Sequence, residues 1–535
     1  MGQFYIGSDT WDPQLIQQVG GAIGNEARQY GVDLMLGPAI NIQRNVLNGR
    51  NFEYFSEDPW LNAMITVGYI NGMQAQGVGA VLKHFAANNQ ETRRQTVNEI
   101  ISPRALREIY FPGFEYAMEK AQPWAVMSSY PAINGTPSTQ NSWLLKDVLR
   151  HQWKFNGFVM SDWYGVSDPV RALQNGNDLN MPGGLSEKET PFLRRNTDPK
   201  DVILAALKSG ELTQHQIDEN IRNILNGVIK THRFKDAGAA GRSEPIDHSS
   251  LARQVAADSM VLLKNDSATL PMPSSFRIAA FGHNVNNFFV IGGGSAEVNI
   301  DPKRLVTLSQ GMKNAGLTLI DTIEGQPLNE QANDAAITRA AQQSDIALIS
   351  VGRSSTEGAD RYSMTMHADE VAMIERVSAL FHQQNKKVVV VLNIGSPIEM
   401  ASWESNADAI LLAWQPGEQA GNAVADILTG KVNPSGKLPL TFPKRLEDSP
   451  GFGNYPGSAK TVIYGEGIYV GYRYFDTRRI APMYPFGYGL SYSSVKYGKA
   501  RPEKPVFNLD KQESIKISVQ LHNLSQRETK EVVQL

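Results

Sequence analysis

Cysteine is absent from the 535-residue sequence. Its absence excludes disulfides, thiolate metal sites and a cysteine nucleophile, although it does not assign the protein to a compartment. Long apolar runs are also lacking. The run Val-Val-Val-Val-Leu at residues 388–392 is among the longest, and it is far below the ~18 residues of a membrane span. We therefore expect no membrane partner.

The sequence has no excess of basic charge, because 51 Lys and Arg stand against 54 Asp and Glu, a net charge of −3. Without a basic footprint we expect no nucleic-acid partner. Residues 1–5 lack the charged region and the long apolar region of a signal peptide, which favours a cytoplasmic protein. Homo-oligomerisation is left open.

Metal and nucleotide motifs are missing too. The nine histidines include no H-x-x-x-H pair, and no carboxylate cluster has ligand spacing. The Gly-Gly-Gly-Ser run at residues 292–295 lacks the spacing of phosphate-binding loops, which argues against a nucleotide-dependent α/β enzyme. We expect neither a metal nor any other cofactor.

The chain is too long to fold around a single hydrophobic core, so we expect two or three domains. Residues 1–235 alternate short apolar runs with helical patterns, which predicts an α/β domain of the (β/α)-barrel type. The convincing runs cover residues 34–36, 80–82, 125–127, 158–160 and 178–181, with a further candidate at 4–7. A barrel needs eight strands, so the barrel looks incomplete.

The remainder predicts three further parts. Residues 236–249 are expected to be a linker. Residues 250–445 contain strand candidates at 277–281, 345–351, 387–392 and 409–414, separated by helical stretches, which predicts an α/β sandwich with a mostly parallel sheet. Residues 446–492 connect this domain to a partial β domain at 493–535, where residues 514–521 alternate like a half-buried strand.

Two carboxylates follow strand-like runs. Asp162 ends the run Gly-Phe-Val-Met-Ser at 157–161, and Glu357 lies in the segment 353–361. Strands that end in an acid present it at the edge where α/β folds carry their chemistry, and retaining glycoside hydrolysis needs two such carboxylates. The alternative interpretations are a helix cap for Asp162 and a surface glutamate for Glu357.

These segments, together with Lys83-His84-Phe85 and residues 49–53 (Gly-Arg-Asn-Phe-Glu), resemble glycoside hydrolase family 3, the β-glucosidase family, over almost the whole chain. The resemblance implies that Asp162 is the nucleophile and Glu357 the general acid/base. One comes from each domain, so the site would lie in a shared cleft. It also implies that residues 493–535 begin a fibronectin-III-like domain.

The substrate-binding residues that the resemblance implies are Arg50, Lys83, His84, Arg94, Tyr130, Trp163 and Ser295. His84 and Tyr130 have the alternative of being core residues. Cations around Asp162 should keep it ionised, whereas partial desolvation and the like charge of Asp162 should raise the pKa of Glu357.

The resemblance implies a retaining β-glucosidase that removes terminal non-reducing β-D-glucosyl residues from a β-glucoside or oligosaccharide. The Ser-Asp-Trp form at 161–163 favours this over a xylosidase, and no N-acetylglucosaminidase loop is found. The alternatives are such exo-glycosidases or a catalytically weak carbohydrate-binding fragment.

Members of the family usually begin with a strand and an acid-bearing segment before the counterpart of residues 8–13. That acid binds the glucose hydroxyls farthest from the scissile bond. We therefore expect a chain truncated at both ends, a fragment of a larger product that is weakly active or inactive alone.

Overall fold

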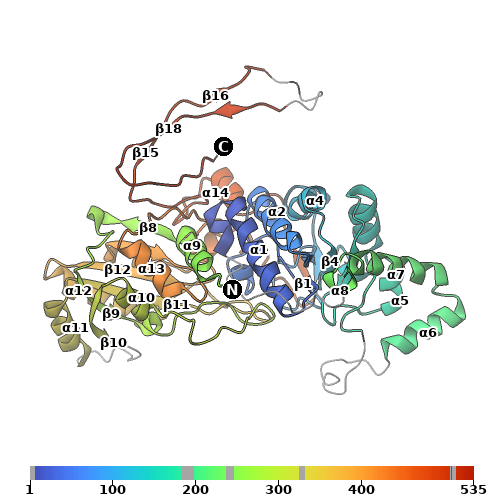
Figure 1. Cartoon of the computed structure of the whole chain (residues 1–535), viewed down its shortest axis with the longest axis horizontal. Coiled ribbons are helices and arrows are strands. Elements are labelled where there is room, and N and C mark those ends of the chain that lie inside the picture. The colour runs from blue at the N-terminus through green and yellow to red at the C-terminus, as the bar shows by residue number, and fades with distance from the viewer. Residues whose placement is uncertain are drawn as a thin grey trace.

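The computed structural model describes residues 6–183, 198–235, 246–323, 332–506, 508 and 514–534. The predicted linker at 236–249 falls largely outside these residues. In Figure 1, helices α1 (Pro13–Gln29) and α2 (Pro59–Ala75) occupy the centre, and an α/β layer lies on the left. Among the described residues, no helix has the length and apolar character to cross a membrane.

The first sheet has four parallel strands in the order β1 (Leu34–Met35), β2 (Gly79–Phe85), β4 (Ala125–Ser128) and β7 (Phe158–Ser161). The strands predicted near residues 34, 80, 125 and 158 are thus confirmed. The fifth candidate contributes only an isolated parallel bridge between Leu179 and Met160. Within the described residues the sheet stays open, so no closed barrel forms.

The strand candidate at residues 4–7 is wrong where it can be checked. Ile6–Thr10 forms a 3-10 helix, η1, and residues 4 and 5 lie outside the described part of the chain. The next helix begins as its sequence predicts: the Asp12 carboxylate accepts the Leu15 N–H at 2.9 Å, and Pro13 is the first helical residue.

The second sheet has six strands in the order β10 (Thr318–Ile323), β9 (Arg277–Phe281), β11 (Ile346–Gly352), β12 (Lys387–Asn393), β13 (Ala409–Leu412) and β8 (Val261–Asn265). All pairings are parallel except β13 with β8. Residues 388–392 are wholly buried, as a strand covered on both faces requires. The four predicted strands are confirmed, and β8 and β10 are additions.

Helices of the second part are α9 (Ser249–Ser259), α10 (Leu308–Asn314), α11 (Ala332–Gln343), α12 (Ala368–His382) and α13 (Ala420–Leu428). Helix α12 presents Ile374, Val377 and Phe381 to the core, the spacing that predicted it. The result is one continuous apolar core around Trp403, separate from the core under α1 and α2.

The C-terminal strands extend away from the body of the molecule (Figure 1). β15 (Val495–Tyr497) pairs antiparallel with β18 (Leu521–Asn523), and β16 (Arg501–Pro502) with β17 (Ile517–Ser518). Ile517 is 40% exposed and Leu521 37%. The prediction of a half-buried strand at 514–521 is wrong at these positions, because each ladder has only two strands and no second layer covers it among the described residues.

The segment after the second sheet returns to the first part of the chain. β14 (Thr461–Ile463) pairs in parallel with β3 (Asn98–Ile100). Beside this pair, the Arg44 guanidinium lies 3.7 Å from the centre of the Tyr464 ring and binds Glu466, and the Tyr464 hydroxyl donates to Glu99 at 2.8 Å. This buried polar network joins the connecting segment to the N-terminal part.

Glu99 predicts a pH dependence of stability. Burial raises its pKa from the ordinary 4.5 to about 8, against the Tyr464 hydrogen bond and the Arg44 charge. Folding therefore takes up a proton, so the stability tied to neutral Glu99 is complete below pH 4.5 and is lost as pH rises through about 8. We expect Glu99→Gln and wild type to melt alike at low pH, with the variant melting higher at alkaline pH. A gap between their melting temperatures that does not grow with pH would contradict this.

Candidate active site

A cavity of about 600 Å³ opens at the C-terminal edge of the first sheet. Its polar lining comprises Arg50, Lys83, His84, Tyr130, Asp162, Trp163, Ser295 and Glu357. These are eight of the nine residues predicted from the sequence to form the site. The ninth, Arg94, donates a hydrogen bond to Glu357. Val32, Leu34, Met35, Leu36, Pro38 and Phe55 form an apolar wall.

Parallel strands explain the convergence, because their carboxyl ends share one edge. Asp162 follows β7 directly, and Tyr130 lies two residues beyond β4. Lys83 and His84 are neighbours in β2, where successive side chains normally face opposite ways. The pairing of β2 with β4 shifts register between Leu82 and Phe85, and both side chains reach the cavity.

Asp162 presents one free oxygen to the cavity. Its Oδ1 accepts the Trp163 N–H at 2.8 Å, while Oδ2 is buried and accepts no hydrogen bond from the described residues. Burial raises the pKa of Asp162, and the charges of Arg50 and Lys83 act to lower it. The predicted cations are therefore present, although desolvation outweighs them.

Arg50 is the most deeply buried cation of the site, with its side chain 1% exposed. Its Nε binds Glu53, and Nη1 lies 3.6 Å from Glu357 Oε1. Nη1 and Nη2 make no hydrogen bond with the described residues. Two guanidinium nitrogens and Asp162 Oδ2 thus offer unused donors and an acceptor at one cavity.

His84 is a neutral imidazole. Burial, followed by the charges of Arg50 and Lys83, holds its pKa well below 6.5. Nε2 lies 3.7 Å from Asp162 Oδ2, and Nδ1 contacts Asn41 Oδ1 at 3.2 Å. Asn41 also accepts the His84 N–H and donates to the His84 carbonyl. Sequence reasoning missed Asn41, because nothing in the sequence sets this amide apart from other loop amides.

Glu357 reaches the same cavity from the second part of the chain, on the loop after β11. Its Oε1 accepts from Arg94 at 2.8 Å, and its Oε2 accepts the Ser295 N–H at 2.8 Å. The prediction of a raised pKa is wrong. Burial acts in that direction, but the Arg50 charge, the hydrogen bonds at Ser295 and the Arg94 charge lower the pKa to about 2.

Two glycines allow the close packing of the Glu357 loop. Gly294 has φ +91°, and a Cβ there would meet the Glu357 Cβ at 2.4 Å. A Cβ on Gly49 would lie 1.8 Å from the Ala359 carbonyl oxygen. Side chains at these points would displace the Glu357 loop, so the glycines are steric requirements of the site.

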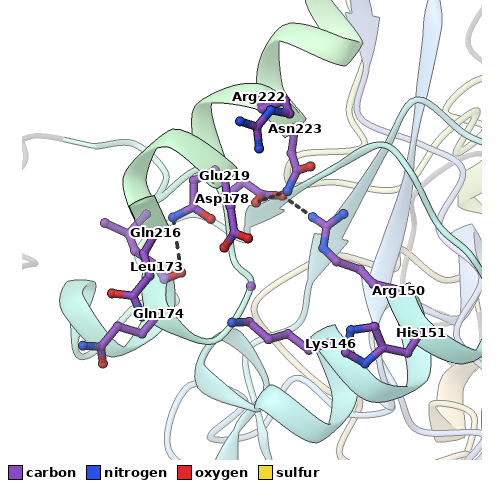
Figure 2. Close-up of a pocket in the computed structure, with 12 residues that line it drawn as sticks. Lys146, Arg150, His151, Leu173, Gln174, Asp178, Gln216, Glu219, Arg222 and Asn223 are labelled. Carbon is purple, nitrogen blue, oxygen red and sulfur yellow. Dashed lines mark hydrogen bonds and ion pairs between the residues drawn. The ribbon is translucent and has the colours of Figure 1, made fainter. Parts of the chain in front are cut away.

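A second cavity of about 270 Å³ lies between η5 (Trp143–Gln152), α5 (Pro169–Gln174) and α7 (Gln214–Val228), near the opposite end of β7 (Figure 2). There Asp178 accepts from Arg150 at 2.5 Å, from Asn223 at 2.9 Å and from the Val159 N–H at 2.7 Å. None of the nominated site residues lines this cavity.

Across the described residues, no group of three or more histidines and carboxylates is arranged to hold a metal ion. The lining of the larger cavity offers two carboxylates, two cations, a neutral imidazole and four aromatic rings.

Known proteins match this chain over both of its α/β parts. Residues 5–226 match the Glycosyl hydrolase family 3 N terminal domain, and residues 260–492 match the Glycosyl hydrolase family 3 C-terminal domain. Thermostable beta-glucosidase B of Acetivibrio thermocellus is 41% identical over 98% of this chain and 68% of that protein.

Two further comparisons agree. The exo-alpha-(1->6)-L-arabinopyranosidase of Bifidobacterium longum is 41% identical over 91% of this chain and 64% of that protein, so the chain spans about two thirds of these relatives. The structure of beta-glucosidase 3B from Thermotoga neapolitana in complex with glucose superposes with a TM-score of 0.91 at 40% identity, covering 98% of this chain and 76% of the other. With a 41% identical relative aligned over nearly its whole length, this chain belongs to glycosyl hydrolase family 3.

Proposed function

We propose that this glycoside hydrolase removes terminal non-reducing β-D-glucosyl residues with retention of anomeric configuration. One observation carries the proposal. Asp162 Oδ2 and both terminal nitrogens of Arg50 are buried at one cavity without hydrogen-bond partners among the described residues, and Glu357 lies on the adjoining wall. A sugar ring supplies hydroxyls for such donors and an anomeric carbon for such a carboxylate.

The chemistry is a double displacement. Asp162 Oδ2 forms a bond to the anomeric carbon as the bond from that carbon to the leaving oxygen breaks, and Glu357 gives its proton to that oxygen. Water then attacks the anomeric carbon, Glu357 takes a water proton, and the ester to Asp162 breaks. With a pKa of about 2, Glu357 is ionised, as the base step requires, although a pKa this low makes it a weak base. Its role as acid requires that sugar binding weaken the contacts to Arg94 and Ser295.

The remaining groups bind and orient the sugar. Lys83 and Arg50 provide charged donors, and the neutral His84 can donate or accept without adding charge. Trp163 offers an apolar ring surface of the kind that packs on a pyranose. The Arg94 guanidinium lies 4.5 Å from the centre of the Tyr130 ring, and Arg94 also donates a hydrogen bond to Glu357.

We infer the following division into domains: a barrel-like catalytic domain at 1–235, a linker at 236–249, an α/β sandwich at 250–445, a connecting segment at 446–492 and a fibronectin-III-like module at 493–535. The four-stranded parallel sheet, the mostly parallel six-stranded sheet and the two antiparallel ladders support this division. The open four-stranded sheet is compatible with consecutive strands of a (β/α) barrel.

A second candidate function is α-L-arabinopyranoside hydrolysis, because a relative of that name is as similar to this chain as the β-glucosidase is. Aryl glycosides separate the two. We expect hydrolysis of aryl β-D-glucoside to exceed that of the α-L-arabinopyranoside, β-D-xyloside and N-acetyl-β-D-glucosaminide. A higher kcat/KM on the arabinopyranoside would make the second candidate the function, and no hydrolysis of any of them would contradict both.

Replacement of the proposed nucleophile gives a direct test. Asp162→Asn removes the attacking charge while keeping the Trp163 hydrogen bond available, so the loss on aryl β-glucoside should be about 10³-fold or more without a change in melting temperature. A 2-fluoro-glucoside should label wild type at Asp162, detected by peptide mass spectrometry. A label on another carboxylate would reassign the nucleophile.

Glu357→Gln should separate substrates by their leaving groups. Substrates with poor leaving groups, such as cellobiose, should lose about 10²-fold or more, because they need protonation, whereas dinitrophenyl β-glucoside should lose far less in its first step. Azide should restore turnover of the activated glucoside and yield the β-glucosyl azide. Equal losses on both substrates, with no azide product, would show that another group is the acid.

A further inference from the structure

Glu91 is a buried carboxylate next to the cavity that does not line it. Its Oε2 accepts the Gly358 N–H at 2.7 Å and Arg94 Nη1 at 2.6 Å. The same Arg94 nitrogen donates to Glu357 Oε1 at 2.8 Å. Two carboxylates, one from each α/β part, therefore share one guanidinium nitrogen, and Glu91 also holds the residue that follows Glu357.

The contact is reciprocal. On the Glu357 loop, Asp360 accepts the N–H groups of Glu91 at 2.9 Å, Thr92 at 2.8 Å and Gly49 at 3.1 Å. Each loop thus binds the backbone of the other through a carboxylate side chain. Glu357 is also bound within its own part, where its Oε2 accepts the Ser295 N–H and its backbone N–H donates to the Gly293 carbonyl at 3.2 Å.

We propose that Glu91 is a positioning residue for Glu357, fixing that carboxylate in the cavity through Arg94 and the Gly358 amide. The proposal rests on the proposed function for its kinetic consequences, but its structural claim stands separately. Glu91 is not among the residues that line the cavity, so it acts through Glu357 and takes no part in bond making.

Because Glu91 and Glu357 share Arg94, the ionisation of one carboxylate affects the pKa of the other. Burial raises the pKa of Glu91 to about 7, against the charges of Arg50 and Arg94, while that of Glu357 is about 2. Other charged and titratable groups that face this pair are Asp360, Lys83, Tyr54, Tyr130 and Tyr455. When Glu91 is ionised, it competes for Arg94 and repels the charge on Glu357. Removing that charge therefore lowers the pKa of Glu357. Glu357 then becomes a weaker base, and a smaller fraction of it is protonated and able to act as an acid.

The kinetic test compares Glu91→Gln with Glu370→Gln. Glu370 forms an ion pair with Arg353 at the start of the same loop, at 2.6 Å, and touches neither Arg94 nor Gly358. For cellobiose, Glu91→Gln should lower kcat/KM by about 10-fold or more, because small displacements of a catalytic group are costly. Above about pH 7, where Glu91 is ionised in wild type, the basic limb of its pH–rate profile should move to lower pH. Glu370→Gln should leave both nearly unchanged.

The shared pathway can be checked in the Glu357→Gln background, where adding Glu91→Gln should cause little further loss on cellobiose. Additive losses would show that Glu91 acts independently of Glu357 and would overturn the proposal. Equal pH–rate profiles for Glu91→Gln and Glu370→Gln would overturn the proposal too. They would show that Glu91, like Glu370, has no specific effect on the basic limb.

Hydrogen exchange provides a readout that needs no turnover. Glu91→Ala removes the acceptor of the Gly358 amide, so the peptide covering residues 353–361 should exchange faster than in wild type, whereas Glu370→Ala should not release the amides at 358–360. Unchanged exchange in Glu91→Ala would refute the contact. If wild type hydrolyses no glycoside but this exchange difference is seen, the proposed function fails while the positioning contact stands.

Discussion

The buried guanidinium of Arg50 is the group on which the site depends. Removing such a cation from water costs several kcal/mol, and carboxylates nearby have to offset that cost. Glu53 binds it from the same loop, and Glu357 faces it from the second α/β part at 3.6 Å. The charge of Arg50 thus favours docking of the two parts, and the docking in turn brings Glu357 to the cavity.

The same burial explains why similar carboxylates behave differently. The side chains of Glu99 and Glu91 are fully buried, so desolvation raises their pKa values to about 8 and about 7, although Glu91 receives two donors and lies near the charges of Arg50 and Arg94. Glu357 is less buried and receives two donors and two arginine charges, so its pKa falls. Glu91 and Glu357 have equal numbers of donors and lie near the same two arginines, so their depth of burial decides whether desolvation or Coulomb attraction sets the direction of the pKa shift.

The sequence pattern predicted those features of the fold that depend on residues close together in the chain. The apolar runs near residues 80, 125, 158 and 388 are strands, and Asp162 follows its strand into the cavity. The run at 178–181 forms only a bridge, because Asp178 turns to bind Arg150 and the start of β7. The pKa of Glu357 was predicted to rise through partial desolvation and the like charge of Asp162, but the charges of Arg50 and Arg94 and the hydrogen bonds at Ser295 outweigh the effect of burial.

By itself the sequence determined the strands, the pairing of a strand-end acid with a distant glutamate and the family resemblance, because these depend on short spacings and residue types. Only the tertiary structure decided that Glu91 and Glu357 share Arg94, that Asn41 holds His84 and that Asp360 binds the opposite loop. Those contacts join residues far apart in the chain, and their strength depends on distance and desolvation, which no local pattern contains.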